Sequence, residues 1–134
     1  MIELAVLLGL AAIVFLSAAI QHGGTVLSRG VGFVMTDRSQ ALPETGFSGR
    51  SRRTLQNNVE SALMSGPILT VLAISGTASP LSGQIAAFYL ATRIFFTLSY
   101  WAGINKLRSV SWGLGMASMV VLFVLAANGL LGQR

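Results

Sequence analysis

The chain has 134 residues, of which 53% are hydrophobic and only 10% are charged. A soluble globular domain carries about 25% charged residues, so this composition excludes an ordinary water-soluble domain. The net charge of +5 is explained by basic residues at predicted helix ends, and no nucleic-acid partner is expected. The chain has no cysteine and a single histidine, His22. We therefore expect no disulfide, no cysteine nucleophile and no metal site.

Four segments are predicted to form membrane-spanning helices, since each contains roughly the 20 mostly apolar residues that a span requires. They cover about residues 2–20, 52–79, 81–104 and 109–131. The first segment lacks the basic n-region of a signal peptide, so we expect it to be retained. The prediction is an all-α integral membrane protein, with one domain over residues 1–134 built as a four-transmembrane-helix bundle.

The connections between these helices are expected to differ in length. Residues 21–50 are predicted to form a long irregular loop, because glycine, serine, threonine and proline recur there. The turn between helices two and three is short. Ser79 is expected to cap helix three, with Pro80 at its first helical position.

The basic residues predict how the chain crosses the membrane. Seven of the nine lie on the first and third connections, which share one face of a four-span protein: Arg29, Arg38, Arg50, Arg52, Arg53, Lys106 and Arg108. Lysine and arginine near helix ends favour the cytosolic side. We therefore expect loops 1–2 and 3–4 in the cytosol, both termini on the opposite side, and contacts with anionic lipids. The membrane would be the inner membrane of a bacterial cell, or otherwise that of the endoplasmic reticulum.

A polar segment, RRTLQNNVES at residues 52–61, opens the second helix. Arg53, Asn57, Glu60 and Met64 follow one another at spacings of four, three and four residues, which places them on one helix face. The second helix is therefore predicted to present a polar face at its cytosolic end.

The third helix is predicted to carry a matching face, made of Tyr89, Arg93, Phe96, Thr97 and Tyr100. Arg93 would lie about 15 Å inside the membrane at the helical rise of about 1.5 Å per residue. A charge at that depth requires a partner or a hydrated cavity. Glu60 is the acid nearest to the membrane interior, so we expect an Arg93–Glu60 contact, either direct or through a bound molecule.

More polar groups gather near Glu60 than one carboxylate can satisfy. They are Arg53, Asn57, Arg93, Tyr100 and Arg108. The planar guanidinium of arginine can bind a carboxylate through two parallel hydrogen bonds, and several guanidinium groups together suit a ligand with more than one negative charge. The sequence therefore predicts an anion site that opens to the cytosol at head-group depth, where a water-soluble anion meets a lipid-soluble substrate.

These residues resemble motifs of the MAPEG family, the membrane-associated proteins in eicosanoid and glutathione metabolism. "RRTLQNNVE" is similar to the Arg-x-x-x-Asn-x-x-Glu pattern that opens helix two in that family. "RIFFTLSY" followed by "LRSVSW" resembles its helix-three arginine and tyrosine and its basic entry to helix four. The resemblance covers essentially the whole chain, and the chain looks like a bacterial-type member of the family. It implies a homotrimer that binds glutathione between neighbouring subunits.

The resemblance also implies roles for individual residues. Arg53, Asn57 and Glu60 would hold the backbone and carboxylates of glutathione, and Arg93 and Tyr100 would line the same pocket. Small residues on helices two and four (Ala62, Gly66, Thr70, Gly113 and Ala117) would allow close helix packing, although they suit several assemblies.

The chemistry that the resemblance implies centres on the start of helix four. Arg108 would lie near the glutathione sulfur, where a cation lowers the pKa of a thiol. Ser109 would donate a hydrogen bond to the thiolate, and Tyr100 would be a second stabilising residue. Trp112 stands where family members often carry an aromatic residue. The chain differs from well-studied members at Phe96, where several carry histidine or tyrosine.

Three functions are consistent with these patterns. The first is a glutathione-dependent transferase or peroxidase acting on lipophilic electrophiles or lipid hydroperoxides. The second is a non-catalytic scaffold or lipid-binding trimer, in which an Arg93–Glu60 pair would close the pocket. The third is a small multidrug transporter. Such exporters depend on an acid within helix one, and here that helix has only Glu3 at its edge.

Overall fold

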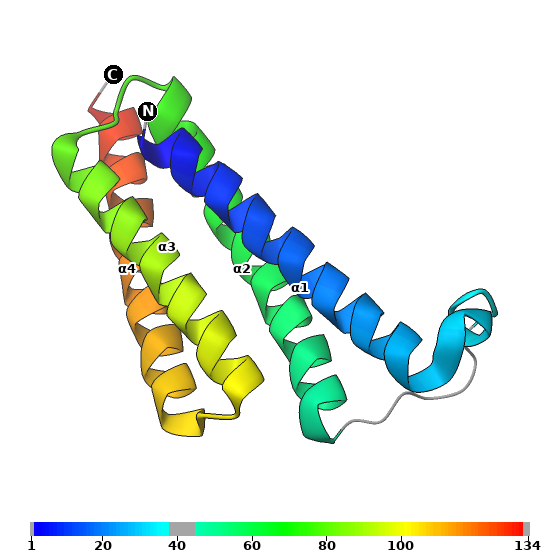
Figure 1. Cartoon of the computed structure of the whole chain (residues 1–134). Coiled ribbons are helices and arrows are strands. Elements are labelled where there is room, and N and C mark those ends of the chain that lie inside the picture. The colour runs from blue at the N-terminus through cyan, green and yellow to red at the C-terminus, as the bar shows by residue number, and fades with distance from the viewer. Residues whose placement is uncertain (1, 38–44, 133–134) are drawn as a thin grey trace.

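The computed structural model describes residues 2–37 and 45–132, and four helices make up that part of the chain (Figure 1). They are α1 (Ile2–Val34), α2 (Gly46–Ile74), α3 (Pro80–Ala102) and α4 (Asn105–Leu131). The start of α1, the end of α4 and the α2–α3 turn lie at one end of the bundle (Figure 1). The α3–α4 turn and the start of α2 lie at the other end, so the two predicted basic connections share one face of the molecule.

The first helix is much longer than predicted, and the prediction of an irregular loop from residue 21 is wrong up to Val34. A glycine inside a helix costs only about 1 kcal/mol relative to alanine, so Gly23 and Gly24 do not by themselves end α1. Just beyond them, Thr25 is 4% exposed and donates a hydrogen bond to the Gln21 carbonyl at 3.0 Å. The helix bends at Gly30, whose φ of 82° and ψ of 162° favour glycine.

The other helix ends differ from the predictions by a few residues. The second helix begins at Gly46 instead of 52 and ends at Ile74 instead of 79. Gly76, two residues beyond its end, has a left-handed φ of 74°. Ser79 caps the next helix, where its Oγ accepts a hydrogen bond from Ser82 N at 3.1 Å. The predicted cap by Ser79 and the predicted first-turn proline of α3 are both confirmed.

The turn between α3 and α4 is tighter than predicted. Gly103 ends α3 in the left-handed conformation, with a φ of 77°, and α4 begins at Asn105 instead of 109. Arg108 and Ser109 consequently lie within the first turns of α4. Of the basic residues on the predicted connections, Arg38 lies outside the described residues.

Three helices, α1, α3 and α4, are long and apolar enough to cross a membrane. The prediction of four such helices is therefore met in part. The second helix is long, with 29 residues, but Asn57, Asn58 and Glu60 lower the hydropathy of its most apolar window.

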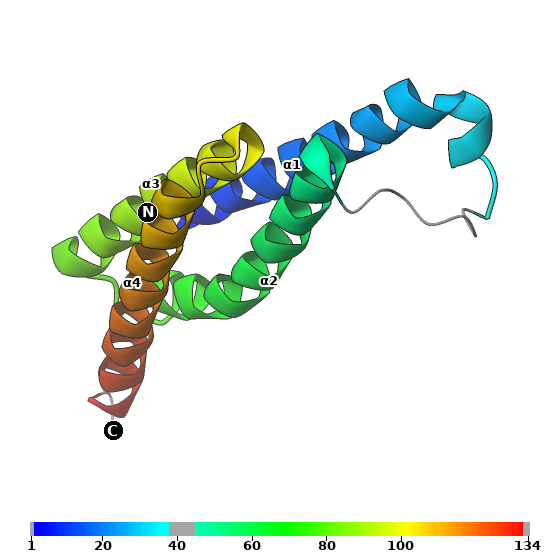
Figure 2. The ribbon, with the colours of Figure 1, turned by 90° about the horizontal axis from the view of Figure 1, so that it is seen from below.

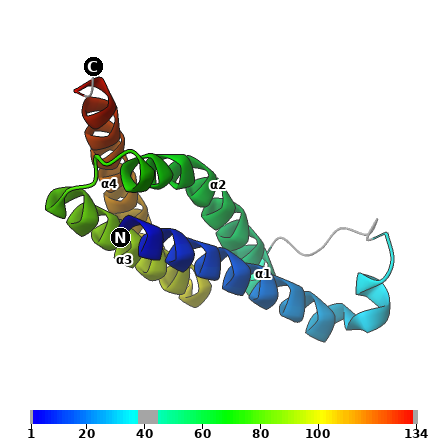
Figure 3. The same ribbon diagram turned by 90° about the horizontal axis from the view of Figure 1, so that it is seen from above.

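The two central helices hold the bundle together, because α2 and α3 each contact the other three helices. Views from below and from above show α1 and α4 running in different directions (Figures 2 and 3). The buried hydrophobic core consists of Val6, Leu10, Leu69, Leu72, Ala86, Tyr89, Met119, Leu122 and Ala126. At the end of the bundle where the chain begins, Ser82 Oγ donates a 2.6 Å hydrogen bond to the buried Glu3 carboxylate. Glu3 thus fixes α1 to the first turn of α3.

Candidate functional site

Two adjoining cavities lie where α2, α3 and α4 meet toward the basic end of the bundle, and together we call them the polar cleft. The larger has a volume of about 310 Å³ and the smaller about 100 Å³. Asn57 and Trp112 line both cavities. The larger is completed by Phe96, Tyr100, Arg108 and Ser109, and the smaller by Glu60, Ser61, Met64, Arg93 and Met116.

The polar face predicted for α2 does face the polar cleft. Asn57, Glu60 and Met64 all line the smaller cavity. Arg53, one turn before Asn57, contacts α3 instead: its Nε donates a 3.1 Å hydrogen bond to the Tyr100 hydroxyl. The helical spacing therefore places Asn57, Glu60 and Met64 on the cleft as the sequence predicts, with Arg53 at its edge beside Tyr100.

Two arginines in the polar cleft lie beside a pair of aromatic rings that contact each other. Phe96 and Tyr100 meet edge to face, with ring centroids 5.5 Å apart. The Arg93 guanidinium lies 4.2 Å from the Phe96 centroid, and that of Arg108 lies 4.7 Å from the Tyr100 centroid. Cation–π contacts of this kind hold a guanidinium in place without neutralising its charge.

The direct Arg93–Glu60 contact is not formed, and that prediction is corrected. Arg93 is 3% exposed, and its Nη2 donates hydrogen bonds to the amide oxygens of Asn57, at 3.0 Å, and of Asn58. The Glu60 carboxylate instead accepts a 3.0 Å hydrogen bond from Gln56, one turn earlier on the exposed side of α2. Since Arg93 and Glu60 both line the smaller cavity, a contact through a bound molecule stays a prediction.

Sequence analysis missed Asn58, which is the centre of a buried hydrogen-bond network. It is 3% exposed, and its Nδ2 donates to Ser17 Oγ at 2.9 Å and to Thr97 Oγ1 at 3.0 Å. Asn58 thereby joins α1, α2 and α3 around the Arg93 guanidinium. One signal was present in the sequence: small polar residues recur at spacings of three and four along α2, at Ser51, Thr54, Asn58, Ser61 and Ser65, and all are buried.

The residues at the start of α4 differ in how freely they can meet a ligand. Trp112 is 45% exposed at the wall shared by both cavities. Ser109 is exposed, but its hydroxyl donates a 3.0 Å hydrogen bond to the Asn105 carbonyl within its own helix. Donation to a ligand therefore requires this hydroxyl to rotate away from Asn105.

The polar cleft is rich in positive charge. Within residues 2–37 and 45–132, no carboxylate forms an ion pair with Arg93 or Arg108, whose partners are neutral amides and aromatic rings. In the same part of the chain, no group of three His, Cys, Asp or Glu residues is arranged to hold a metal ion. The chemistry available to the cleft is therefore binding of an anion and stabilisation of negative charge by guanidinium groups.

Comparison with known families gives a match over most of the chain. A sequence model of the MAPEG family matches residues 4–128, a range that includes every residue of the polar cleft. A comparison with curated proteins gives no match.

Proposed function

The chain belongs to the MAPEG family, and we propose that it is a membrane-bound glutathione-dependent transferase or peroxidase. Its substrates would be lipophilic electrophiles or lipid hydroperoxides. The observation that carries the proposal is the position of Arg108, whose guanidinium lies 4.7 Å from the Tyr100 ring centroid in the wall of a cavity of about 310 Å³. Small-molecule sites have volumes of about 300–1,000 Å³, so the cavity is large enough to hold a compact ligand.

Glutathione binding is supported by the distribution of charge in the polar cleft. Glutathione has two carboxylates and one ammonium group. The cleft is lined by Arg93, Arg108 and the carboxylate of Glu60, and Arg53 reaches its edge through the hydrogen bond to Tyr100. We assign the carboxylates of the tripeptide to the arginines, its ammonium group to Glu60 and its backbone amides to Asn57. Trp112, which is partly exposed, would cover the ligand on the α4 side.

For conjugation, the chain has to supply a thiolate and orient two reactants. The Arg108 guanidinium favours ionisation of the glutathione thiol, because an adjacent cation stabilises the negative sulfur. The Tyr100 hydroxyl and, after rotation, the Ser109 hydroxyl are further donors to that sulfur. The thiolate then attacks an electrophilic carbon, a carbon–sulfur bond forms, and the leaving group departs with the bonding electrons. Fixing both reactants removes translational freedom, which contributes several kcal/mol to catalysis.

Reduction of a hydroperoxide uses the same thiolate. Its sulfur attacks the terminal peroxide oxygen, the oxygen–oxygen bond breaks, and the alkoxide takes up a proton to give an alcohol. A second glutathione then reduces the resulting sulfenic acid, which yields glutathione disulfide and water. Arg108, Tyr100 and Ser109 would have the same roles as in conjugation, so the site alone favours neither reaction.

We further propose a homotrimer of four-span subunits, with loops 1–2 and 3–4 in the cytosol and both termini on the opposite side. Support for self-association comes from the small-residue rows on α2 and α4. A Cβ atom added at Gly66 or Gly113 would meet no atom within 4 Å among the described residues, so neither glycine packs closely against another helix of the same subunit. In a bacterial cell the trimer would lie in the inner membrane.

Calorimetry of glutathione binding to the purified, detergent-solubilised protein tests the function. Saturable binding that is lost in Arg53→Ala, but kept in Arg52→Ala, would support the proposed site. The neighbouring Arg52 is a matched control because it is the same residue type one position earlier on α2, about 100° around the helix from Arg53, whose Nε reaches the Tyr100 hydroxyl. Absence of binding at several millimolar glutathione would overturn the enzyme proposal and favour a scaffold or lipid-binding trimer.

A further inference from the structure

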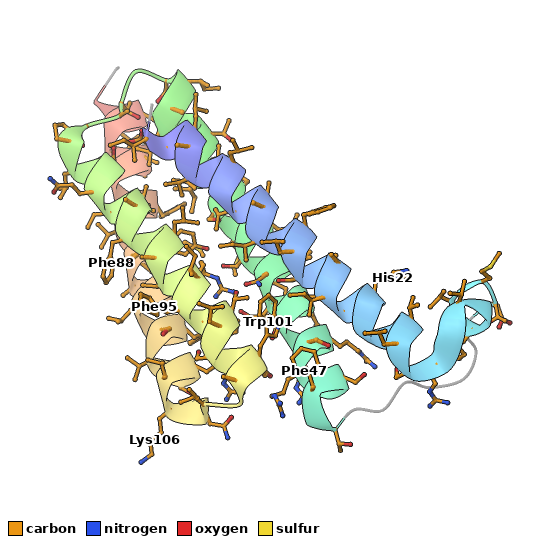
Figure 4. The ribbon with its side chains drawn as sticks, in the orientation of Figure 1. His22, Phe47, Phe88, Phe95, Trp101 and Lys106 are labelled. Carbon is orange, nitrogen blue, oxygen red and sulfur yellow. The ribbon has the colours of Figure 1, made fainter. Side chains whose placement is uncertain are left out.

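Two asparagines that differ in their access to the polar cleft orient the guanidinium of Arg93. Figure 4 shows Phe88 and Phe95 on the edge of α3 that faces away from α2, so Arg93, two residues before Phe95, projects toward α2. There its Nη2 donates hydrogen bonds to the amide oxygens of Asn57 and Asn58. Asn57 lines both cavities of the cleft, whereas Asn58 lines neither and is 3% exposed. Asn58 can therefore affect a ligand only through a residue that it holds.

The amide of Asn58 is fixed in one orientation. Its Nδ2 donates to Ser17 Oγ at 2.9 Å and to Thr97 Oγ1 at 3.0 Å, which leaves its Oδ1 to face Arg93. An amide turned over would place its NH2 donors against the guanidinium, which has no acceptor. Of the side chains that Asn58 contacts in this way, Arg93 is the one that lines the cleft. Helices α1, α2 and α3 thus jointly fix the acceptor that anchors Arg93.

The anchored guanidinium lies near an opposite charge with which it does not pair. Within residues 2–37 and 45–132, Nε and Nη1 of Arg93 make no hydrogen bond, and Arg93 lines the smaller cavity. The Glu60 carboxylate lines the same cavity of about 100 Å³, yet its partner is Gln56. Opposite charges in so small a space attract each other. Their separation therefore requires a restraint on one of them.

We propose that Asn58 is this restraint, and that it is a positioning residue of the glutathione site. By holding Nη2, it keeps Arg93 away from Glu60 and leaves both charges available to the ligand. The inference rests on the proposed function in taking glutathione as that ligand. Without the Asn58 oxygen, Nη2 keeps only the partly exposed Asn57, and the guanidinium turns to the Glu60 carboxylate. The resulting ion pair cancels the charges that bind a carboxylate and the ammonium group of the tripeptide.

A stability measurement without any ligand tests the restraint. Glu60→Gln is introduced into the wild type and into Asn58→Leu, which removes the amide but keeps a side chain of similar size. In the wild type, Glu60→Gln should leave the unfolding temperature in detergent unchanged. In Asn58→Leu it should lower that temperature by about 3 °C or more, because Glu60 has become the partner of Arg93. If Asn58→Leu does not fold, Asn58→Ser replaces it, since a serine hydroxyl ends one bond short of the amide oxygen.

Two further backgrounds are matched controls. Asn58→Asp loses the same Nδ2 donor as Asn58→Leu but keeps an oxygen that accepts from Arg93, so Glu60→Gln should again have no effect. Thr54→Val removes a buried hydroxyl one turn earlier on the same face of α2, where it donates to the Arg50 carbonyl. Glu60→Gln should be neutral there as well.

The four backgrounds separate the restraint from a merely structural role. An equal effect of Glu60→Gln in all of them, whether zero or a loss of stability, would overturn the proposal. A loss that also appears with Asn58→Asp or Thr54→Val would mean that any damage to the buried network has this effect, and would likewise overturn it.

Calorimetry with glutathione tests the consequence for binding. Asn58→Leu should weaken binding by about tenfold or more, since charge-assisted contacts to the ligand are lost, and Thr54→Val should leave the affinity unchanged. Equal affinities of the wild type and Asn58→Leu would overturn the positioning role. If the wild type bound no glutathione, the enzyme proposal would fail and the positioning role with it, whereas the unfolding temperatures would still decide whether Asn58 keeps Arg93 apart from Glu60.

Discussion

Arg93 on α3 is held by Asn58 on α2, whose amide oxygen accepts a hydrogen bond from Arg93 Nη2. Both side chains are 3% exposed. A buried guanidinium is therefore accommodated by neutral amides and an aromatic ring, and its positive charge stays available to the polar cleft. An ion pair with Glu60 would have cancelled this charge. The arrangement explains why a deep arginine is compatible with a site for an anion.

Asn58→Leu should destabilise the protein by at least about 1–3 kcal/mol, because it leaves the Arg93 guanidinium and the Ser17 and Thr97 hydroxyls without this partner. Thermal unfolding in detergent measures the effect. Gln56→Leu is the control, since it is the same kind of substitution at an exposed position two residues earlier. Equal unfolding temperatures for the two variants would show that the network contributes nothing to stability.

Glu60→Gln should leave the unfolding temperature unchanged, because Glu60 is exposed and its hydrogen-bond partner is the exposed side chain of Gln56. Its glutathione affinity should fall by about tenfold or more, as expected when a charge-assisted hydrogen bond to the ligand ammonium group is weakened. Calorimetry and thermal unfolding of the same preparation separate the two effects. A loss of stability as large as that of Asn58→Leu would instead indicate an Arg93–Glu60 pair.

Arg108→Ala should raise the pKa of the bound glutathione thiol by about 1–3, because a cation within about 4–6 Å favours the charged form of an acid. The thiolate fraction at neutral pH then falls, and the rise of activity with pH moves to more alkaline values. Titration of the thiolate absorbance measures this pKa directly. Ser109→Ala should change it less, since the Ser109 hydroxyl already donates to the Asn105 carbonyl. Identical titrations of wild type and Arg108→Ala would remove Arg108 from its proposed role.

Gly115→Ala should destabilise the contact between α3 and α4. A Cβ atom at this position would lie 3.0 Å from Thr92 Oγ1, which is fixed by its 2.6 Å hydrogen bond to the Tyr89 carbonyl. Gly24→Ala is a suitable comparison, because a Cβ atom there meets nothing within 4 Å. That change should stabilise α1 by about 0.5–1 kcal/mol through helix propensity. Unfolding temperatures that rise in both variants would show that the close approach at Gly115 can relax.

Much of the architecture was predictable because it depends on local sequence. Long apolar runs predicted four helices, the Ser79–Pro80 pair predicted the start of α3, and helical spacing predicted that Asn57, Glu60 and Met64 share a face. These features depend on helical periodicity and on backbone chemistry within one or two turns, so they need no knowledge of the neighbouring helices.

Other features were decided only by the tertiary structure. The partner of Arg93 depends on the register between α2 and α3, which brings Asn58 rather than Glu60 to the guanidinium. Burial of the Trp101 indole Nε1, which has no hydrogen-bond partner among the described residues, is likewise decided by tertiary packing. By itself the sequence determined which side chains share a helix face, whereas the packing of those faces against one another determined which side chains meet.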